Sequence, residues 1–146
     1  MKTKYILLIE DNQDDIDLTL RAFKKHKLIN DITVIKDGAE ALEFIFCTGK
    51  YAARDIADVP AFILLDLNLP KVNGLEILKQ IRENPKTKPI PVIILTSSKH
   101  DQDVINGYSL GVNSYIRKPV DFAKFLDAIA QIEAYWLILN EPPIIT

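Results

Sequence analysis

The stretch Ala61-Phe62-Ile63-Leu64-Leu65-Asp66-Leu67-Asn68-Leu69-Pro70 decides the fold of this 146-residue chain, because it joins an unbroken apolar run to an acidic residue. Consecutive apolar residues without polar alternation predict a strand that is buried on both faces of a sheet. Strands of this kind belong to parallel sheets with helices on both sides. The run is followed by Asp66, so the sequence predicts a carboxylate at the carboxyl end of this strand.

Similar apolar runs recur along the chain, and stretches with helical spacing separate them. The other four runs are Tyr5–Ile9, Ile32–Ile35, Val92–Leu95 and Ser114–Ile116. The last helical stretch is the clearest, with Phe122, Phe125, Leu126, Ile129, Glu133 and Trp136 at i, i+3, i+4, i+7 spacing. The alternation predicts an α/β fold, (βα)5, in which a doubly wound five-stranded parallel sheet carries helices on both faces.

Residues that favour turns, helix caps and helix ends support the same boundaries between strands and helices. Asp37-Gly38 predicts a turn after the second strand, and Asn84-Pro85 predicts the end of the third helix, since proline cannot continue a helix. Asp121 is placed to cap the last helix. We find no internal repeat and no linker, and therefore expect one domain over residues 1–140 and a C-terminal tail over 141–146.

The composition limits the classes of function. Hydrophobic residues make up 48% of the chain and the formal charge is -2, which is typical of a globular protein and gives no reason to expect nucleic acid as a partner. The longest apolar runs fall well short of the roughly 20 residues that span a bilayer. A single cysteine, Cys47, excludes an internal disulfide and fits a reducing compartment. We therefore expect a cytoplasmic protein with no membrane partner.

Chemically active residues follow four of the predicted strands. In open parallel sheets, ligands bind at the carboxyl ends of the strands, beside the point where the strand order reverses. The residues found there are Glu10 and Asp11 after the first strand, Asp66 after the third, Thr96 and Ser97 after the fourth, and Lys118 after the fifth. Any one of these residues could be a solvated turn residue, but their joint occurrence at one edge predicts a site.

This combination of carboxylates, hydroxyl groups and a lysine suits phosphoryl transfer. Clustered carboxylates need a cation, and Mg²⁺ prefers oxygen ligands, whereas the absence of histidine and cysteine among these residues argues against zinc. A carboxylate beside Mg²⁺ can attack phosphorus and form an aspartyl phosphate. Lys118 would add a compact positive charge, and the Thr96 hydroxyl could donate a hydrogen bond to the phosphoryl oxygens.

Taken together, these motifs resemble the receiver domains of two-component response regulators. The matching pieces are Ile9-Glu10-Asp11, Leu64 through Pro70 with Gly74, Leu95-Thr96-Ser97, Tyr115, and Lys118-Pro119. They occur in the family's order and cover nearly the whole chain. The resemblance implies a flavodoxin-like fold with strand order 2-1-3-4-5. It also implies a signalling phosphoacceptor that takes part in its own phosphorylation and dephosphorylation, and not an enzyme.

The same resemblance implies a role for each residue around the phosphorylation site. Asp66 matches the phosphoacceptor. Asp11 matches a direct Mg²⁺ ligand and Glu10 one that acts mainly through water, with glutamate standing where aspartate is commoner. The backbone carbonyl of Asn68 would complete the protein ligands of the metal. Lys118 matches the lysine that contacts the phosphoryl group.

A second group of residues is implied to form the switch. Thr96 matches the hydroxyl that moves toward the phosphoryl group, and Tyr115 the aromatic that then rotates inward. Ser97 would lie near the path by which water reaches the acyl phosphate. Pro119 would follow a cis peptide bond, which proline alone makes inexpensive. The surface formed by the fourth helix, fifth strand and fifth helix would then change its preferred partner.

Two features resemble small stand-alone receivers that partner phytochrome-like sensor kinases. The segment from Cys47 to Pro60 is longer than a minimal receiver needs, and Tyr135-Trp136-Leu137 prolongs the last helix. A sensor histidine kinase is the expected donor, and a histidine phosphotransferase is an alternative partner for onward transfer. The aromatic end of the last helix favours a homodimer patch and ordinary packing on the sheet about equally.

Three other functions fit the sequence less well. A phosphorylation-independent interaction domain on this fold would typically lack the acceptor or the acidic pair. An aspartate-based phosphatase would need a second acid where Asn68 stands, and an amide cannot donate the catalytic proton. A flavin or dinucleotide site would need a glycine-rich turn after the first strand, where Glu10 and Asp11 would repel phosphate.

Overall fold

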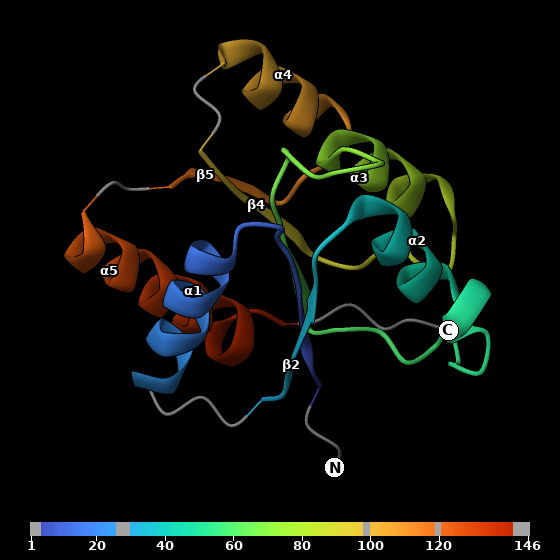
Figure 1. Cartoon of the computed structure of the whole chain (residues 1–146), viewed down its shortest axis with the longest axis horizontal. Helices are drawn as coiled ribbons and strands as arrows, with labels where there is room; N and C mark the ends of the chain where they lie inside the picture. Colours follow the sequence, from blue (N-terminus) through green and yellow to red (C-terminus); the bar gives the residue numbers. More distant parts are fainter. Residues whose placement is uncertain (1–3, 26–29, 98–99, 119–120, 142–146) are drawn as a thin grey trace.

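The structure, a computed structural model, describes residues 4–25, 30–97, 100–118 and 121–141. Its centre is a parallel five-stranded sheet in the order β2-β1-β3-β4-β5 (Figure 1). The strands are β1 (Ile6–Ile9), β2 (Ile32–Ile35), β3 (Phe62–Leu65), β4 (Val92–Thr96) and β5 (Ser114–Arg117). The predicted strand order is therefore confirmed, and each strand matches its predicted run to within one residue at either end.

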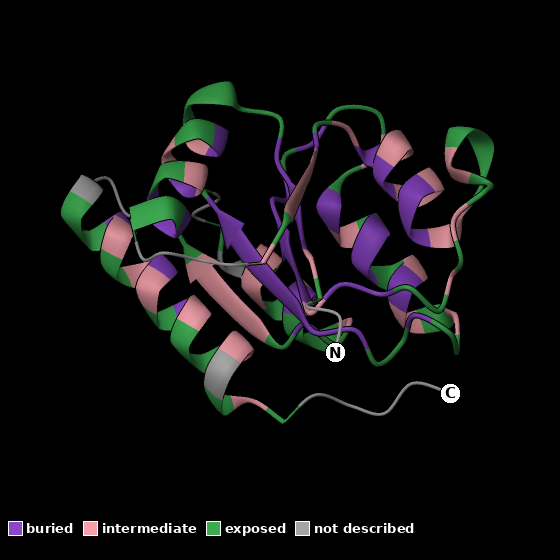
Figure 2. Ribbon diagram, turned by 90° about the horizontal axis from the view of Figure 1, so that it is seen from below, coloured by how far each residue is buried: buried purple, intermediate pink, exposed green. Residues whose placement is uncertain are grey.

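Helices cover both faces of the sheet. They are α1 (Gln13–Lys25), α2 (Gly38–Phe46), α3 (Gly74–Glu83), α4 (Asp101–Ser109) and α5 (Phe122–Glu133). Helices α1 and α5 lie on one face, and α2, α3 and α4 lie on the other (Figure 1). Figure 2 shows that the buried residues run along the strands and the inward sides of the helices. The doubly wound architecture predicted from the apolar runs is thus confirmed.

Alternate residues of the buried strands supply two hydrophobic clusters, one on each face of the sheet. Leu7, Ile9, Ile63 and Leu65 pack with residues of α2 and α3, whereas Ile6, Leu8, Phe62 and Leu64 pack with residues of α1 and α5. Strands β1, β3 and β4 are buried throughout. Burial on both faces is the physical reason why these strands read as uninterrupted apolar runs.

Side-chain caps fix where four of the described helices begin, and that of α1 is Asn12, whose oxygen accepts from the N–H of Asp15 at 3.0 Å. Asp37 accepts from the backbone N–H of Glu40, and Asn73 from that of Glu76, at 2.7 and 3.0 Å. Asp121 accepts from Ala123 in the same way, which confirms its predicted capping role. The chain turns at Asp37 after β2, as predicted, and Asp37 is also the N-cap of α2, whose first residue is Gly38.

The end of the last helix differs from simple helical periodicity. Helix α5 ends at Glu133, and a π-helix, η2 (Ala134–Leu139), continues the chain. Trp136 and Leu137 are partly buried against the α1/α5 cluster, whereas Tyr135 is 51% exposed. Ordinary packing therefore accounts for two of the three residues considered for a homodimer patch. Most of the predicted tail, residues 142–146, lies outside the described residues.

The loop that follows β3 is held in place by very close packing against α3. The backbone N–H of Gly74 donates to the carbonyl of Leu67 at 3.0 Å. A Cβ atom on Gly74 would lie 2.3 Å from the carbonyl oxygen of Asp66 and 2.8 Å from the Cα of Leu67. Both contacts are with backbone, which cannot move aside without displacing Asp66.

We predict that Gly74→Ala lowers the free energy of unfolding by about 1–3 kcal/mol, the usual cost of forced overpacking. Gly107→Ala is the matched control, because a Cβ there would meet only side-chain carbons, of Ile94 and Tyr115, at 3.2 Å or more. Urea denaturation followed by circular dichroism measures both values. A smaller loss for Gly74→Ala than for Gly107→Ala would contradict the close packing of this loop.

Candidate functional site

The ends of β1 and β3 place three acidic side chains at the carboxyl edge of the sheet. Glu10 and Asp11 follow β1, and Asp66 follows β3. The two buried acids extend the ladder hydrogen bonds beyond the strands: the N–H of Glu10 donates to Ile35, and that of Asp66 donates to Ile9, both at 3.0 Å. Since both bonds come from neighbouring parallel strands, they fix where the carboxylates lie.

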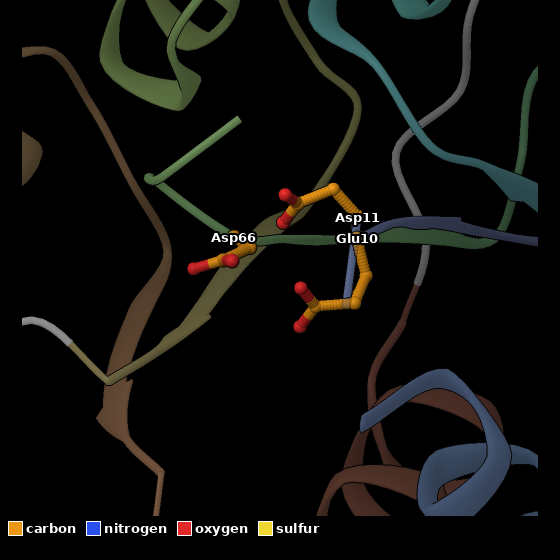
Figure 3. Close-up of side chains that lie close together, drawn as sticks. All are labelled: Glu10, Asp11 and Asp66. Carbon is orange, nitrogen blue, oxygen red and sulfur yellow. The ribbon is translucent and has the colours of Figure 1, made fainter. Parts of the chain in front are cut away.

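The three carboxyl groups face a common space (Figure 3). One oxygen from each of Glu10, Asp11 and Asp66 lies within 4.8 Å of the others. Glu10 and Asp66 are 3% and 6% exposed, whereas Asp11 is exposed. The cluster therefore has a buried floor and one acid at its solvent side, which is an open arrangement for a cation that keeps some of its water.

Lys118 supplies a positive charge to this cluster from the end of β5. Its backbone N–H donates to the carbonyl of Thr96 at 2.7 Å, which carries the β4–β5 pairing one residue past the strand. Its ammonium donates to Glu10 and, at 2.7 Å, to Asp15. The ammonium lies 3.9 Å from the nearer oxygen of Asp66. Three acids from β1, α1 and β3 thus share one lysine that is 9% exposed.

Burial and neighbouring charges change the protonation of this site. Burial raises the pKa of Glu10 to about 7, and the hydrogen bond from Lys118 opposes this while the charge of Asp66 adds to it. Burial acts against the charged form of Lys118, but its hydrogen bonds to Asp15 and Glu10 outweigh it and raise the pKa of the ammonium. A charged lysine alone therefore does not neutralise the acidic cluster.

These residues fit a divalent cation. The site gathers carboxylate oxygens from Glu10, Asp11 and Asp66, which are hard ligands of the kind that Mg²⁺ and Mn²⁺ accept. Burial is the main cause of the raised pKa of Glu10, and the like charge of Asp66 adds to it. A bound cation would favour the ionised form of all three acids. Asn68 is exposed in the loop after β3, and its predicted carbonyl contact with the metal stays a prediction.

The predicted switch residues that the structure describes lie in β4 and β5 or directly after β4. Thr96 is fully buried at the end of β4, and Ser97 follows it in an exposed position. Tyr115 is paired with Ile94 in the β4–β5 register, and its ring lies against Gly107 of α4. Pro119 and its predicted cis peptide bond lie outside the described residues.

Sequence reasoning missed one member of the site, Asp15. It lies in the first turn of α1, where an acidic residue is ordinarily explained by the helix dipole. The only signal in the sequence is that Asp15 follows Glu10 and Asp11 closely. That spacing points to the site only when it is known that three residues connect β1 to α1. That short connection holds the first turn of α1 over the same edge of the sheet.

Comparison with known proteins agrees with this geometry. Residues 6–130 match the family described as the response regulator receiver domain. The chain therefore belongs to the receiver domains of two-component signalling, which are signalling proteins that bind a divalent metal and work with histidine kinases. Among the described residues, no helix has the length and apolar character needed to cross a membrane.

Several relatives are stand-alone regulators of similar length. The chain is 38% identical to response regulator Rcp1 of Synechocystis, over 92% of this chain and 89% of that protein. It resembles a crystal structure of the phosphorylated cyanobacterial phytochrome response regulator RcpA, with a TM-score of 0.90, 36% identity, and coverage of 98% and 100% of the two chains. It also resembles a structure of Mn²⁺-bound Rcp1, with a TM-score of 0.89, 37% identity, and coverage of 97% and 100%.

The raised pKa of Glu10 predicts that the metal-free protein loses stability as the pH rises. The pKa moves from 4.5 to about 7 on folding, so the stabilising protonation is complete below about pH 4.5 and is lost as the pH passes through 7. We expect the free energy of unfolding in EDTA to fall by on the order of 1–2 kcal/mol between pH 5.5 and 8.

Urea denaturation at several pH values measures this loss. Glu10→Gln should flatten the pH dependence, and added Mg²⁺ should restore stability to the original protein at pH 8. A Glu10→Gln variant with an unchanged pH dependence would show that another group is responsible.

Proposed function

We propose that this chain is a phosphorylation-driven switch that accepts a phosphoryl group from a sensor histidine kinase on Asp66. The observation that carries the proposal is the position of the Asp66 carboxylate. It is buried, has an oxygen within 4.8 Å of oxygens of two other acids, and lies 3.9 Å from the ammonium of Lys118. A surface acid with a structural role would not need these neighbours.

In the proposed reaction, a carboxylate oxygen of Asp66 attacks the phosphorus of a phosphohistidine. The phosphorus–nitrogen bond breaks, its electron pair returns to the imidazole nitrogen, and a phosphorus–oxygen bond forms at Asp66. One oxygen of Asp66 accepts from the N–H of Leu67 at 2.8 Å, which orients the carboxylate and leaves its other oxygen facing Lys118. Lys118 would then stabilise negative charge on the transferred group.

Magnesium is the cofactor we propose for this site. Asp11 and Asp66 would hold it directly, Glu10 mainly through water, and Asn68 through its backbone carbonyl. When bound, the ion would neutralise charge on the transferring phosphoryl group. The Mn²⁺-bound form of the relative Rcp1 supports a divalent ion here, since Mn²⁺ and Mg²⁺ share a preference for oxygen ligands.

The response to phosphorylation would pass through Thr96 and Tyr115. A phosphoryl group adds charge and acceptor oxygens, so the Thr96 hydroxyl is drawn toward Asp66. The ring of Tyr115 lies against Gly107 of α4 and would rotate inward as Thr96 moves. Because Tyr115 touches α4 and belongs to β5, its rotation would change the α4-β5-α5 surface. This is a local charge event that biases a two-state element.

The partner is proposed to be a phytochrome-like histidine kinase in the cytoplasm. This proposal rests on similarity to RcpA and to a bacteriophytochrome response regulator, RtBRR, with which the chain shares 49% identity over 97% of its length. That second match has a TM-score of 0.77 and covers 85% of the other chain. A homodimer through the α4-β5-α5 surface and a histidine phosphotransferase partner stay predictions.

We predict that Asp66→Asn abolishes phosphorylation by acetyl phosphate in the presence of Mg²⁺, because an amide has no nucleophilic carboxylate oxygen. Intact-mass spectrometry measures the fraction of protein that carries one added phosphoryl group. Asp31→Asn is the control, since Asp31 is an exposed acid at the opposite edge of the sheet, beside the start of β2. Equal labelling of Asp66→Asn and the original protein would rule out Asp66 as the acceptor.

We also predict that Asp11→Ala weakens Mg²⁺ binding by about tenfold or more, since it removes one of the three converging carboxylates. The chemical shifts of the Asp11 and Leu67 amides, followed during Mg²⁺ titration, give the dissociation constant. Asp14→Ala is the matched control, because Asp14 is an exposed acid in the first turn of α1. Similar weakening by both substitutions would point to a general charge effect and not to coordination.

A further inference from the structure

The ammonium of Lys118 has three N–H donors, and in this structure two of them are directed away from the phosphoacceptor. One donates to Glu10, and another donates to Asp15 at 2.7 Å. The Asp66 oxygen at 3.9 Å lies beyond hydrogen-bond distance. These two contacts therefore draw the ammonium toward β1 and α1, and a phosphoryl group on Asp66 would have to compete with them for the position of the ammonium.

The two present partners of Lys118 differ in how easily they can be released. The side chain of Glu10 is 4% exposed, so its carboxylate, left without the lysine, would remain buried, which is costly. Asp15 is 30% exposed, so water can replace the lysine at its carboxylate. Ion pairs of this partly exposed kind contribute little net free energy and are readily exchanged. Asp15 is therefore the partner that Lys118 can release.

Local helix chemistry does not account for the direction of the Asp15 side chain. Its backbone N–H is capped by the side-chain oxygen of Asn12 at 3.0 Å, and its carbonyl accepts from the buried Thr19 hydroxyl at 2.7 Å. In a capping box, an acid at this helix position would reach back to the N–H of the capping residue. Here Glu10 accepts from the Asn12 N–H, at 3.3 Å, and the Asp15 carboxylate binds Lys118 instead.

We propose that Asp15 is a positioning residue that holds Lys118 in the unphosphorylated receiver and competes with the phosphoryl group for the same ammonium. The inference rests on the proposed function and deepens it. Asp15 stabilises the resting arrangement, since its contact with Lys118 is made there and is given up when the phosphoryl group takes the lysine. Asp15 thus sets the free energy that the phosphoryl group must supply to draw Lys118 away from its resting position.

The consequence is a gain of affinity when the Asp15 charge is removed. Without that competing acceptor, Lys118 is more available to an anion on Asp66. The probe is beryllofluoride, a phosphoryl mimic, added with Mg²⁺ to ¹⁵N-labelled protein and followed through the amide signals of Asp66 and Leu67. We expect Asp15→Asn to lower the beryllofluoride concentration at the midpoint by about two- to fivefold, the range for losing one partly exposed ion pair.

Two further variants separate positioning from other effects. Asp14→Asn removes the same charge from the same helical turn but not the contact with Lys118, so its midpoint should stay within about twofold of the original. Asp15→Glu retains a carboxylate in a partly exposed position and should return the midpoint toward the original value. The ¹⁵N-detected ammonium signal of Lys118 should shift in Asp15→Asn and not in Asp14→Asn.

The outcomes distinguish this inference from the proposed function. If the original protein does not respond to beryllofluoride with Mg²⁺, the proposed function itself is contradicted. If it responds, but Asp15→Asn binds no more tightly than Asp14→Asn, only the positioning role is overturned. A merely structural role for Asp15 predicts weaker binding in Asp15→Asn together with a lower melting temperature, and that result also overturns the inference.

Discussion

The site depends on one buried ammonium placed among acids that the backbone brings together. Lys118 contacts Glu10, Asp15 and Asp66, which come from the end of β1, the first turn of α1 and the end of β3. An uncompensated carboxylate at 3% or 6% exposure would be costly, and this lysine is the protein's own compensation. Because Lys118 carries a single charge among several acids, the site retains an excess of negative charge that a divalent cation can balance.

This excess of negative charge explains why the site can be rigid in its backbone and still sensitive to an added charge. The sheet supplies rigidity, since the hydrogen bonds of Glu10 and Asp66 continue the strand ladders. The side chains supply the sensitivity to charge, since burial and the nearby charge of Asp66 raise the pKa of Glu10. Unbalanced charge of this kind is concentrated at functional positions. The two apolar clusters, one on each face of the sheet, stabilise the fold.

The sequence was sufficient for the architecture because the apolar runs report burial on both faces directly. It was also sufficient to bring Glu10, Asp11, Asp66 and Lys118 together, since parallel strands end at a common edge. It was not sufficient for Asp15, because an acid in the first turn of a helix has an ordinary explanation in the dipole. Periodicity likewise missed the change to a π-helix after Glu133, since residues on one face remain apolar through either type of helix.

The contact between α1 and the end of β5 joins residues that are 103 positions apart in the chain. The three carboxylates belong to the first half of the sequence, whereas their lysine is made near the end of synthesis. During translation, a ribosome-bound chain could therefore gather its acids before it has the cation that balances them. The charge balance of the acidic cluster therefore depends on β5, the last strand to be made, and on the residue that follows it.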